Sequence, residues 1–241
     1  MIHRFIFLLF IISTSAMAQN FTPKSLSELI NTEEPGWKLV EEWIKEGKNK
    51  IEVLPKIQAR AEKALLESQV TTRSPMGAIV YETGGILVDD GWIRILGSGS
   101  ERFDRSLIEW NQGKSFINSG EQPAYLLIAD DVLGGFFAIN NGAFGKDESG
   151  KIFYFAPESL TWESLGIGYS DFIYFCFSGD LDKFYKGFRW MNWEKDVRGL
   201  DANMAFSLMP YPWTKEGKNI NKVTRKAVPI QELWNLYMDN E

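Results

Sequence analysis

The spacing of apolar residues in the first third of the chain is typical of helices. Trp37, Val40 and Ile44 recur at intervals of three or four residues, between Pro35 and Gly47. Proline suits the first turn of a helix and glycine suits its end, so this segment carries signals for both boundaries. The sequence predicts three helices at the front of the protein, over residues 25–30, 35–47 and 57–69.

From residue 78 the apolar residues come instead in short runs, separated by glycine and aspartate. Asp90-Gly91 lies between two such runs, and this dipeptide is a strong signal for a β-hairpin. Residues 106–110 interrupt the series as a predicted short helix. The predicted strands cover 78–81, 86–88, 92–96, 125–128, 136–139 and 151–155.

Helical spacing returns in the last third. Asp180 suits the N-cap of a helix, and the apolar stripe that follows consists of Leu181, Phe184, Tyr185, Phe188 and Met191. A final helix is predicted over residues 229–238. We therefore expect an α+β fold with a helical N-terminal part, a central and mainly antiparallel sheet, and C-terminal helices packed on it, in a single domain of residues 19–241.

The amino terminus has the order of a secretory signal peptide. His3-Arg4 precedes an apolar run over 5–12, and small residues end in Ala16-Met17-Ala18. An N-terminal membrane anchor is the alternative, but the run is much shorter than the roughly 20 residues needed to span a bilayer. The sequence predicts that residues 1–18 are cleaved and that the mature protein is periplasmic or secreted, with no membrane span.

Composition excludes several kinds of chemistry. The chain of 241 residues has one histidine, His3 in the predicted signal peptide, and one cysteine, Cys176. The mature chain therefore has no imidazole for general-base or zinc chemistry, and no internal disulfide can form. The formal net charge of −6 makes nucleic acid an unfavourable partner. No nucleotide-binding or metal-binding motif is present, so no cofactor and no metal are expected.

Charged residues beside or inside apolar runs are the first candidates for a site. Arg73, Glu82 and Arg94 have such positions, so each is either a paired structural charge or the polar element of a pocket. Asp130 and Asp131 are adjacent, as are two aspartates at 89–90. Adjacent residues on a strand point to opposite faces, so neither pair can act by itself as a catalytic pair, and we expect these aspartates to cap turns. The alternative is that one aspartate from each pair lies beside one from the other pair, as a hydrolase would require.

Trp190 and Trp193 are the second group of candidates. On a continuous helix that begins at Leu181 they would point away from the apolar stripe. Either a second layer covers them, for which residues 210–213 are a candidate, or they form an exposed binding platform. We expect the covered arrangement. Cys176 lies in an aromatic segment without cations, so we expect an inert core residue.

A resemblance to a known family rests on short motifs spread over the predicted mature chain. They are TTRSPMG (71–77), YETGG (81–85), GWIRILGSG (91–99), ADDVLGGFF (129–137), YFAP (154–157), SGDL (178–181), FY (184–185), RW (189–190) and ELW (232–234). On these motifs the chain resembles the bacterial family called domain of unknown function 2625. The resemblance implies a shared fold and no known activity, so it transfers no functional residue.

A weaker likeness concerns GFF (135–137), the predicted strand over 151–155 and SDFI (170–173). The order of these segments is similar to the strand-strand-strand-helix order of the Smi1/Knr4 immunity-protein superfamily. Its members are α+β binding proteins, and many of them neutralise toxins. With the missing catalytic residues, this likeness favours an exported, non-enzymatic binding domain whose partner is a protein or glycan of the cell envelope. The alternative is a carboxylate-dependent hydrolase that acts on envelope glycans.

Overall fold

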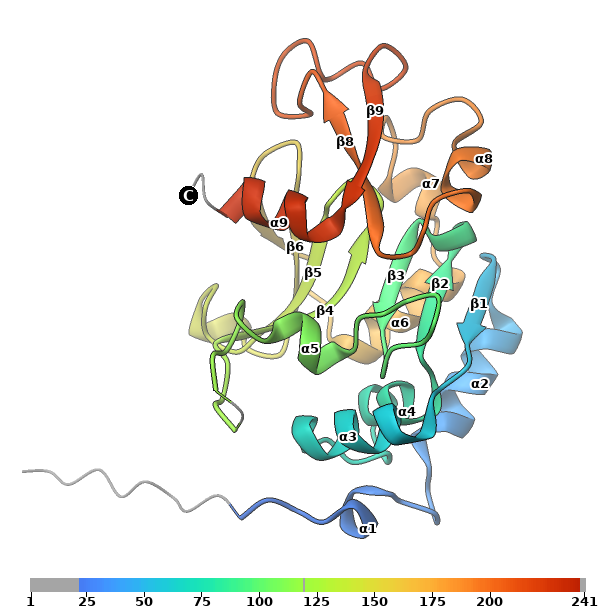
Figure 1. Ribbon diagram of the computed structural model, residues 1–241, viewed down its shortest axis with the longest axis vertical. Helices are drawn as coiled ribbons and strands as arrows, with labels where there is room; N and C mark the ends of the chain where they lie inside the picture. The colour runs from blue at the N-terminus through green and yellow to red at the C-terminus, as the bar shows by residue number, and fades with distance from the viewer. Residues whose placement is uncertain (1–21, 119, 239–241) are drawn as a thin grey trace, which may run out of the picture.

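The computed structural model describes residues 22–118 and 120–238, and the predicted signal peptide lies outside these residues. Figure 1 shows a central sheet with helices on both of its faces. The helices are α1 (Leu26–Leu29), α2 (Gly36–Glu46), α3 (Gln58–Ser68), α4 (Pro75–Glu82), α5 (Leu107–Asn111), α6 (Tyr169–Ser178), α7 (Leu181–Phe184), α8 (Trp193–Arg198) and α9 (Ile230–Met238), with short 3-10 helices η1 (Asp89–Gly91) and η2 (Lys146–Glu148).

Seven strands form one antiparallel meander, in which each strand pairs with the next along the chain. The strands are β1 (Ile51–Leu54), β2 (Gly85–Val88), β3 (Ile93–Leu96), β4 (Tyr125–Asp131), β5 (Phe136–Asn140), β6 (Ile152–Ala156) and β7 (Thr161–Ser164). A separate antiparallel pair consists of β8 (Met204–Met209) and β9 (Thr224–Pro229). The expected antiparallel sheet is confirmed.

Two neighbouring phenylalanines show how the core is layered. The ring centroid of Phe137 on β5 lies 4.8 Å from that of Phe172 on α6. The ring centroid of Phe136 lies 5.0 Å from that of Trp234 on α9. Because successive side chains of a strand point to opposite faces, α6 and α9 cover opposite faces of the sheet, as Figure 1 also shows. The predicted α+β fold, with helices at the front and a C-terminal helix packed on the sheet, is confirmed.

The prediction of a strand over 78–81 is wrong, because these residues lie inside helix α4. The Ser74 side chain accepts a hydrogen bond from the Gly77 N–H, and Pro75 occupies the first turn. Helix α4 contacts α2, α3 and α6, and Ala78, Ile79 and Val80 are all fully buried. A short apolar run that is buried on every side has no periodicity that distinguishes a strand from a helix.

The prediction of one helix from Leu181 to Met191 is also wrong. Helix α7 ends at Phe184, and a new helix begins at Trp193. Gly187 (φ +90°) and Asn192 (φ +65°) adopt left-handed backbone conformations that a continuous helix does not allow. Met191, which the prediction placed on the buried stripe, is 81% exposed.

Four strands and one long helix received no prediction. They are β1, β7, β8, β9 and α6. The strands β1 and β7 form the two edges of the sheet, and most of their residues are exposed or half-buried. An edge strand with little buried surface lacks the alternation of apolar and polar residues on which sequence prediction depends.

In the described part of the chain, the helices are all too short or too polar to cross a bilayer.

Candidate functional site

The candidate site lies at one end of the sheet, beneath the C-terminal segment. In an antiparallel meander, the turns after β2, β4 and β6 meet at the same end of the sheet. Figure 1 shows α7, α8 and the β8–β9 hairpin over this end. Helix α8 contacts η1, and the Phe206 N–H donates to the Val132 carbonyl. Segments from the middle and the end of the chain therefore build the site together.

Arg94 and Asp130 form a buried ion pair at the centre of this end. Arg94 is 1% exposed and Asp130 is fully buried, and the Arg94 Nε donates to Asp130 Oδ1 at 2.6 Å. Arg105 Nη1 donates to the other carboxylate oxygen at 2.5 Å. Burial lowers the pKa of Arg105, although the charge of Asp130 opposes this shift. Both oxygens of Asp130 are therefore occupied by guanidinium groups.

The same two arginines attach the C-terminal segment to the sheet. Arg94 Nη1 donates to the Met204 carbonyl at the start of β8, and Arg105 Nη2 donates to the Ala202 carbonyl at 3.2 Å. Charge-assisted hydrogen bonds of this kind are stronger than neutral ones. This cluster is a structural joint, because the two arginines share the buried carboxylate of Asp130 and at the same time hold two carbonyl groups of the C-terminal segment.

Asp131 points to the other face of β4 and binds four donors. Its Oδ1 accepts the backbone N–H groups of Leu133 and Gly135, both at 2.9 Å. Its Oδ2 accepts the hydroxyls of Tyr154 at 2.8 Å and Tyr185 at 3.1 Å. Burial raises the pKa of Asp131, and the hydrogen bonds oppose that shift. A carboxylate with four donors has no free lone pair that points to a substrate.

Trp92 connects this network to the two candidate tryptophans. Its ring centroid lies 5.3 Å from that of Tyr185, 5.6 Å from Trp190 and 4.9 Å from Trp193. The Arg189 guanidinium lies over the rings of Trp92 and Trp193, with its carbon 5.0 Å and 4.1 Å from the two centroids. Sequence reasoning missed Trp92, although it stands directly after the predicted Asp90-Gly91 turn.

Trp190 is buried, whereas Trp193 is half-buried. Trp190 is 3% exposed, and its Nε1 donates to Asp196 at 2.7 Å. Its cover consists of Phe206 on β8, at 5.4 Å between ring centroids, and Arg225 on β9, whose guanidinium carbon lies 4.6 Å from the ring. A second layer does cover Trp190, but it is the β8–β9 hairpin rather than residues 210–213. Trp213 packs instead on Tyr211 and Tyr237.

Arg73 and Glu82 lie away from this end of the sheet. Arg73 is 66% exposed and pairs with Glu34, with 2.5 Å between Arg73 Nη2 and Glu34 Oε2. Glu82 at the end of α4 pairs with Lys56, at 2.7 Å. The structure thus brings together five of the seven candidate residues, namely Arg94, Asp130, Asp131, Trp190 and Trp193.

The second pair of aspartates is also engaged. Asp89 accepts a hydrogen bond from Arg189 Nη2 at 2.6 Å. Asp90 pairs with Lys50 and with Arg198. All four aspartates of the two adjacent pairs therefore have cationic or hydroxyl partners. Across residues 22–118 and 120–238, no group of three or more acidic, cysteine or histidine side chains is placed to hold a metal ion.

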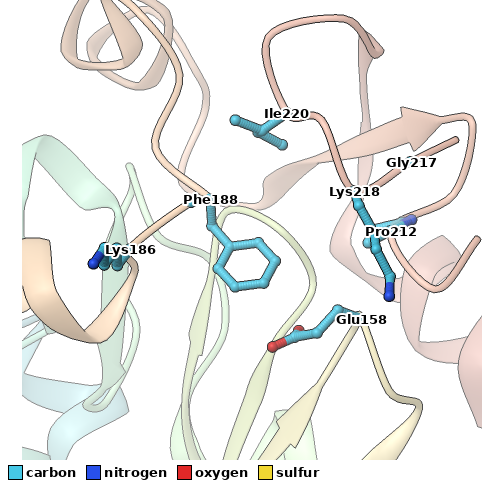
Figure 2. A pocket seen from close by; sticks show the side chains of 8 residues that line it. Glu158, Lys186, Phe188, Pro212, Gly217, Lys218 and Ile220 are labelled. Carbon is cyan, nitrogen blue, oxygen red and sulfur yellow. The ribbon is translucent and has the colours of Figure 1, made fainter. Parts of the chain in front are cut away.

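A pocket of about 320 Å³ opens above this network. Three segments that are far apart in the sequence contribute to it: the β6–β7 turn, the chain after α7, and the long β8–β9 loop. Figure 2 shows the Phe188 ring in the middle of the pocket, between Glu158 and Ile220, with Lys186 and Lys218 on the two flanks. We call it the Glu158 pocket; its lining consists of Glu158, Lys186, Gly187, Phe188, Pro212, Gly217, Lys218 and Ile220.

The charges in the Glu158 pocket have no partners of opposite charge in the described part of the chain. No carboxylate oxygen lies within 4.0 Å of the Lys186 or Lys218 amine, and no cationic nitrogen lies within that distance of Glu158. Burial raises the pKa of Glu158; a hydrogen bond from its own backbone N–H opposes this shift, and the nearby charge of Asp131 adds to it. The pocket thus combines an unpaired carboxyl group, two unpaired amines and an apolar floor.

Sequence reasoning did not select any residue of this pocket as a site candidate. The signals were weak: Glu158 follows Pro157 after a strand, and residues 210–217 form a long loop, a type of segment that often carries function. Neither signal shows that the two loops meet. The Phe188 position was assigned to the stripe of a helix that does not exist.

The chain can now be compared with known proteins. A profile of the family described as "Protein of unknown function DUF2625" matches residues 26–233. The chain belongs to this family. It is 46% identical over 187 residues to an uncharacterised protein of Haemophilus influenzae, a match that covers 78% of this chain and 82% of that protein.

The second relative is described as putative uncharacterised protein YbfG of Escherichia coli K12. It is 43% identical over 213 residues, which cover 88% of this chain and 95% of that protein. No solved structure matches the chain. The resemblance to the family is thus confirmed, whereas the likeness to the Smi1/Knr4 superfamily stays a prediction.

Proposed function

We propose that this member of the DUF2625 family is a non-enzymatic binding domain and that the Glu158 pocket is its ligand site. The single observation that carries the proposal is the set of unpaired charges around an apolar floor. Glu158 is half-buried, whereas Lys186 and Lys218 are exposed. A carboxyl group that is partly removed from water and has no cationic partner destabilises a protein, so its position in a concave site favours a ligand that supplies the partner.

The engaged aspartates support a binding role over hydrolysis. A glycosidase needs two carboxyl groups that flank the scissile bond, one to donate a proton and one to act as base or nucleophile. Asp130 is held by two arginines, and Asp131 by two tyrosines and two backbone N–H groups. The Glu158 pocket is lined by one carboxyl group, Glu158. Neither this network nor the Glu158 pocket therefore presents the two free carboxyl groups that would favour the hydrolase.

The proposal includes a location and a class of partner. The signal peptide predicted over residues 1–18 would export the protein to the periplasm or out of the cell, where it would meet a protein or glycan of the envelope. The support for this part is the order of charged, apolar and small residues at the amino terminus.

A capture experiment with charge-reversed pocket variants tests the binding role. The purified protein would be immobilised, exposed to soluble envelope extract, and the bound protein and glycan identified by mass spectrometry. The test variant is Lys186→Glu with Lys218→Glu. The matched control is Lys183→Glu with Lys195→Glu, which changes two exposed lysines outside the pocket and alters the net charge equally.

We expect a ligand that the wild type and the control recover equally and that the pocket variant does not recover. Equal recovery by all three proteins would place the ligand elsewhere. Recovery by none of them would contradict a binding domain for soluble envelope components.

A further inference from the structure

The geometry of the Glu158 pocket points to a ligand that carries a protonated amine on an apolar body, with a carboxylate at its other end: a free amino acid or a short peptide. This inference rests on the proposed binding role and adds the chemical class of the ligand. Three separate features of the pocket support it.

The first feature is the unpaired carboxyl group. Glu158 is half-buried, and no cation of the described chain lies within 4.0 Å of it. A carboxylate in this position is destabilised by lost hydration, and the opposite charge of a ligand would offset that cost. An amine is the simplest group that provides the charge and also donates hydrogen bonds to both carboxylate oxygens.

The second feature is the apolar floor. The Phe188 ring lies beside Glu158 (Figure 2), and Pro212 and Ile220, which are both buried, line the same pocket. An apolar side chain of the ligand would cover Phe188, and an amine near the ring face would gain a cation–π interaction as well. A ligand with only charged groups would leave this floor exposed to water.

The third feature is the pair of lysines on the flanks. Lys186 and Lys218 come from different segments and lie on opposite sides of Phe188 (Figure 2). Their amines lack carboxylate partners in the described chain. Both side chains are exposed at the edge of the pocket, where either amine can contact an anionic group on the far end of a ligand whose own amine lies at Glu158. A pocket of about 320 Å³ lies at the small end of ligand sites, which favours one or two amino-acid residues.

Three forms of one dipeptide test these features separately. Isothermal titration calorimetry would compare leucyl-leucine with its N-acetyl form, which lacks the cation, and with its C-terminal amide, which lacks the anion. L-leucine would serve as the free amino acid. Charge-assisted hydrogen bonds predict that acetylation weakens binding about ten-fold or more, and that amidation weakens it by a smaller factor.

Two variants assign the effects to residues. Glu158→Gln should remove the preference for the free amine, and Lys186→Ala with Lys218→Ala should remove the preference for the free carboxylate. The thermal midpoint of each variant reports folding. Because Glu158 has no cationic partner to lose, Glu158→Gln should melt no lower than the wild type, so lost binding cannot be attributed to misfolding.

Equal affinity for the free and acetylated peptides, or an unchanged preference in Glu158→Gln, would overturn the inference. So would the absence of binding to all forms at millimolar concentration. If peptides fail while the envelope capture still depends on Lys186 and Lys218, the ligand class is wrong and the binding role stands. If both experiments fail, the proposed function is wrong as well.

Discussion

Arg94 on β3 and Asp130 on β4 are cross-strand partners in the sheet, and their side chains are joined by a 2.6 Å hydrogen bond at almost zero exposure. Arg94 follows the β2–β3 turn and Asp130 precedes the β4–β5 turn, and both turns lie at the end of the sheet that carries the candidate site. The pair also holds the first residue of β8, through the bond from Arg94 to the Met204 carbonyl. Its integrity therefore decides whether the C-terminal segment stays in place above the sheet.

Removing one member of this pair should be strongly destabilising. Asp130→Ala leaves two arginine side chains buried without their carboxylate, which should lower the free energy of unfolding by about 3–5 kcal/mol. Arg73→Ala is the control, since the exposed Arg73–Glu34 pair should contribute less than about 1 kcal/mol. Urea unfolding followed by circular dichroism measures both values. Similar losses in the two variants would contradict the role assigned to the buried pair.

Trp190 should be a core residue rather than a binding platform. Trp190→Ala should cost about 3–5 kcal/mol, because it removes a buried indole between Trp92 and Phe206. Trp193→Ala should cost less, since that side chain is half-buried. Met191→Ala, at an 81% exposed neighbour, is the control and should leave the melting temperature unchanged. An unchanged melting temperature for Trp190→Ala would show that the hairpin does not cover this ring.

Glu158 should make the ligand-free protein less stable as the pH rises. Burial raises the pKa of Glu158 in the folded state above its ordinary value of 4.5, so the folded state binds more protons than the unfolded state in this range. Stability therefore falls as the pH rises from 4.5 through the raised pKa. Glu158→Gln should remove this part of the pH dependence and raise the melting temperature at pH 7. A lower melting temperature for the variant would indicate a partner that Glu158 loses.

Lys114 should release its proton well below the ordinary range for lysine. Its Nζ lies 3.9 Å from the ring centroid of the buried Trp110, over which Arg105 also lies. Burial, with the nearby charge of Arg105, lowers the pKa of Lys114 from 10.5 to about 8. Because the unfolded state then binds more protons between pH 8 and 10.5, this group makes the protein more stable as the pH rises through that window.

An NMR titration would measure the pKa of Lys114 directly. Lysines labelled by reductive ¹³C-methylation give one signal each, and the signal that is absent in Lys114→Arg identifies the residue. We expect its midpoint near pH 8 in the folded protein and near the ordinary value in urea. A midpoint near 10.5 in the folded protein would contradict the packing of Lys114 on Trp110.

Export should produce a chain that begins at Gln19. The apolar run over 5–12 and the Ala16-Met17-Ala18 sequence motivate this prediction. Intact-mass measurement of the protein recovered from the periplasm or medium checks it. Ala18→Arg should block cleavage, because the site requires a small residue at this position. A membrane-bound product that retains Met1 would favour the N-terminal anchor.

The local signals in the sequence predicted those elements whose boundaries depend on neighbouring residues. The helix that ends at Gly47 and the short helix over 106–110 have local causes, as does the turn at Asp90-Gly91, and the structure has all three. The alternation in β5 placed Phe136 and Phe137 on opposite faces. The two adjacent pairs of aspartates were expected to cap turns, because neighbouring strand residues point to opposite faces.

Tertiary structure alone decided what lies above the end of the sheet. Residues 78–81 form a helix because three other helices bury them, and the segment after Phe184 turns because left-handed residues interrupt it. Neither the helix over 78–81 nor the turn after Phe184 is indicated by a periodic pattern of apolar residues in the sequence. The Glu158 pocket joins residues from the β6–β7 turn, the chain after α7 and the β8–β9 loop, and its first and last lining residues, Glu158 and Ile220, are 62 positions apart in the sequence. Local propensity acts over a few residues, whereas such a site exists only after long-range packing has brought its loops together.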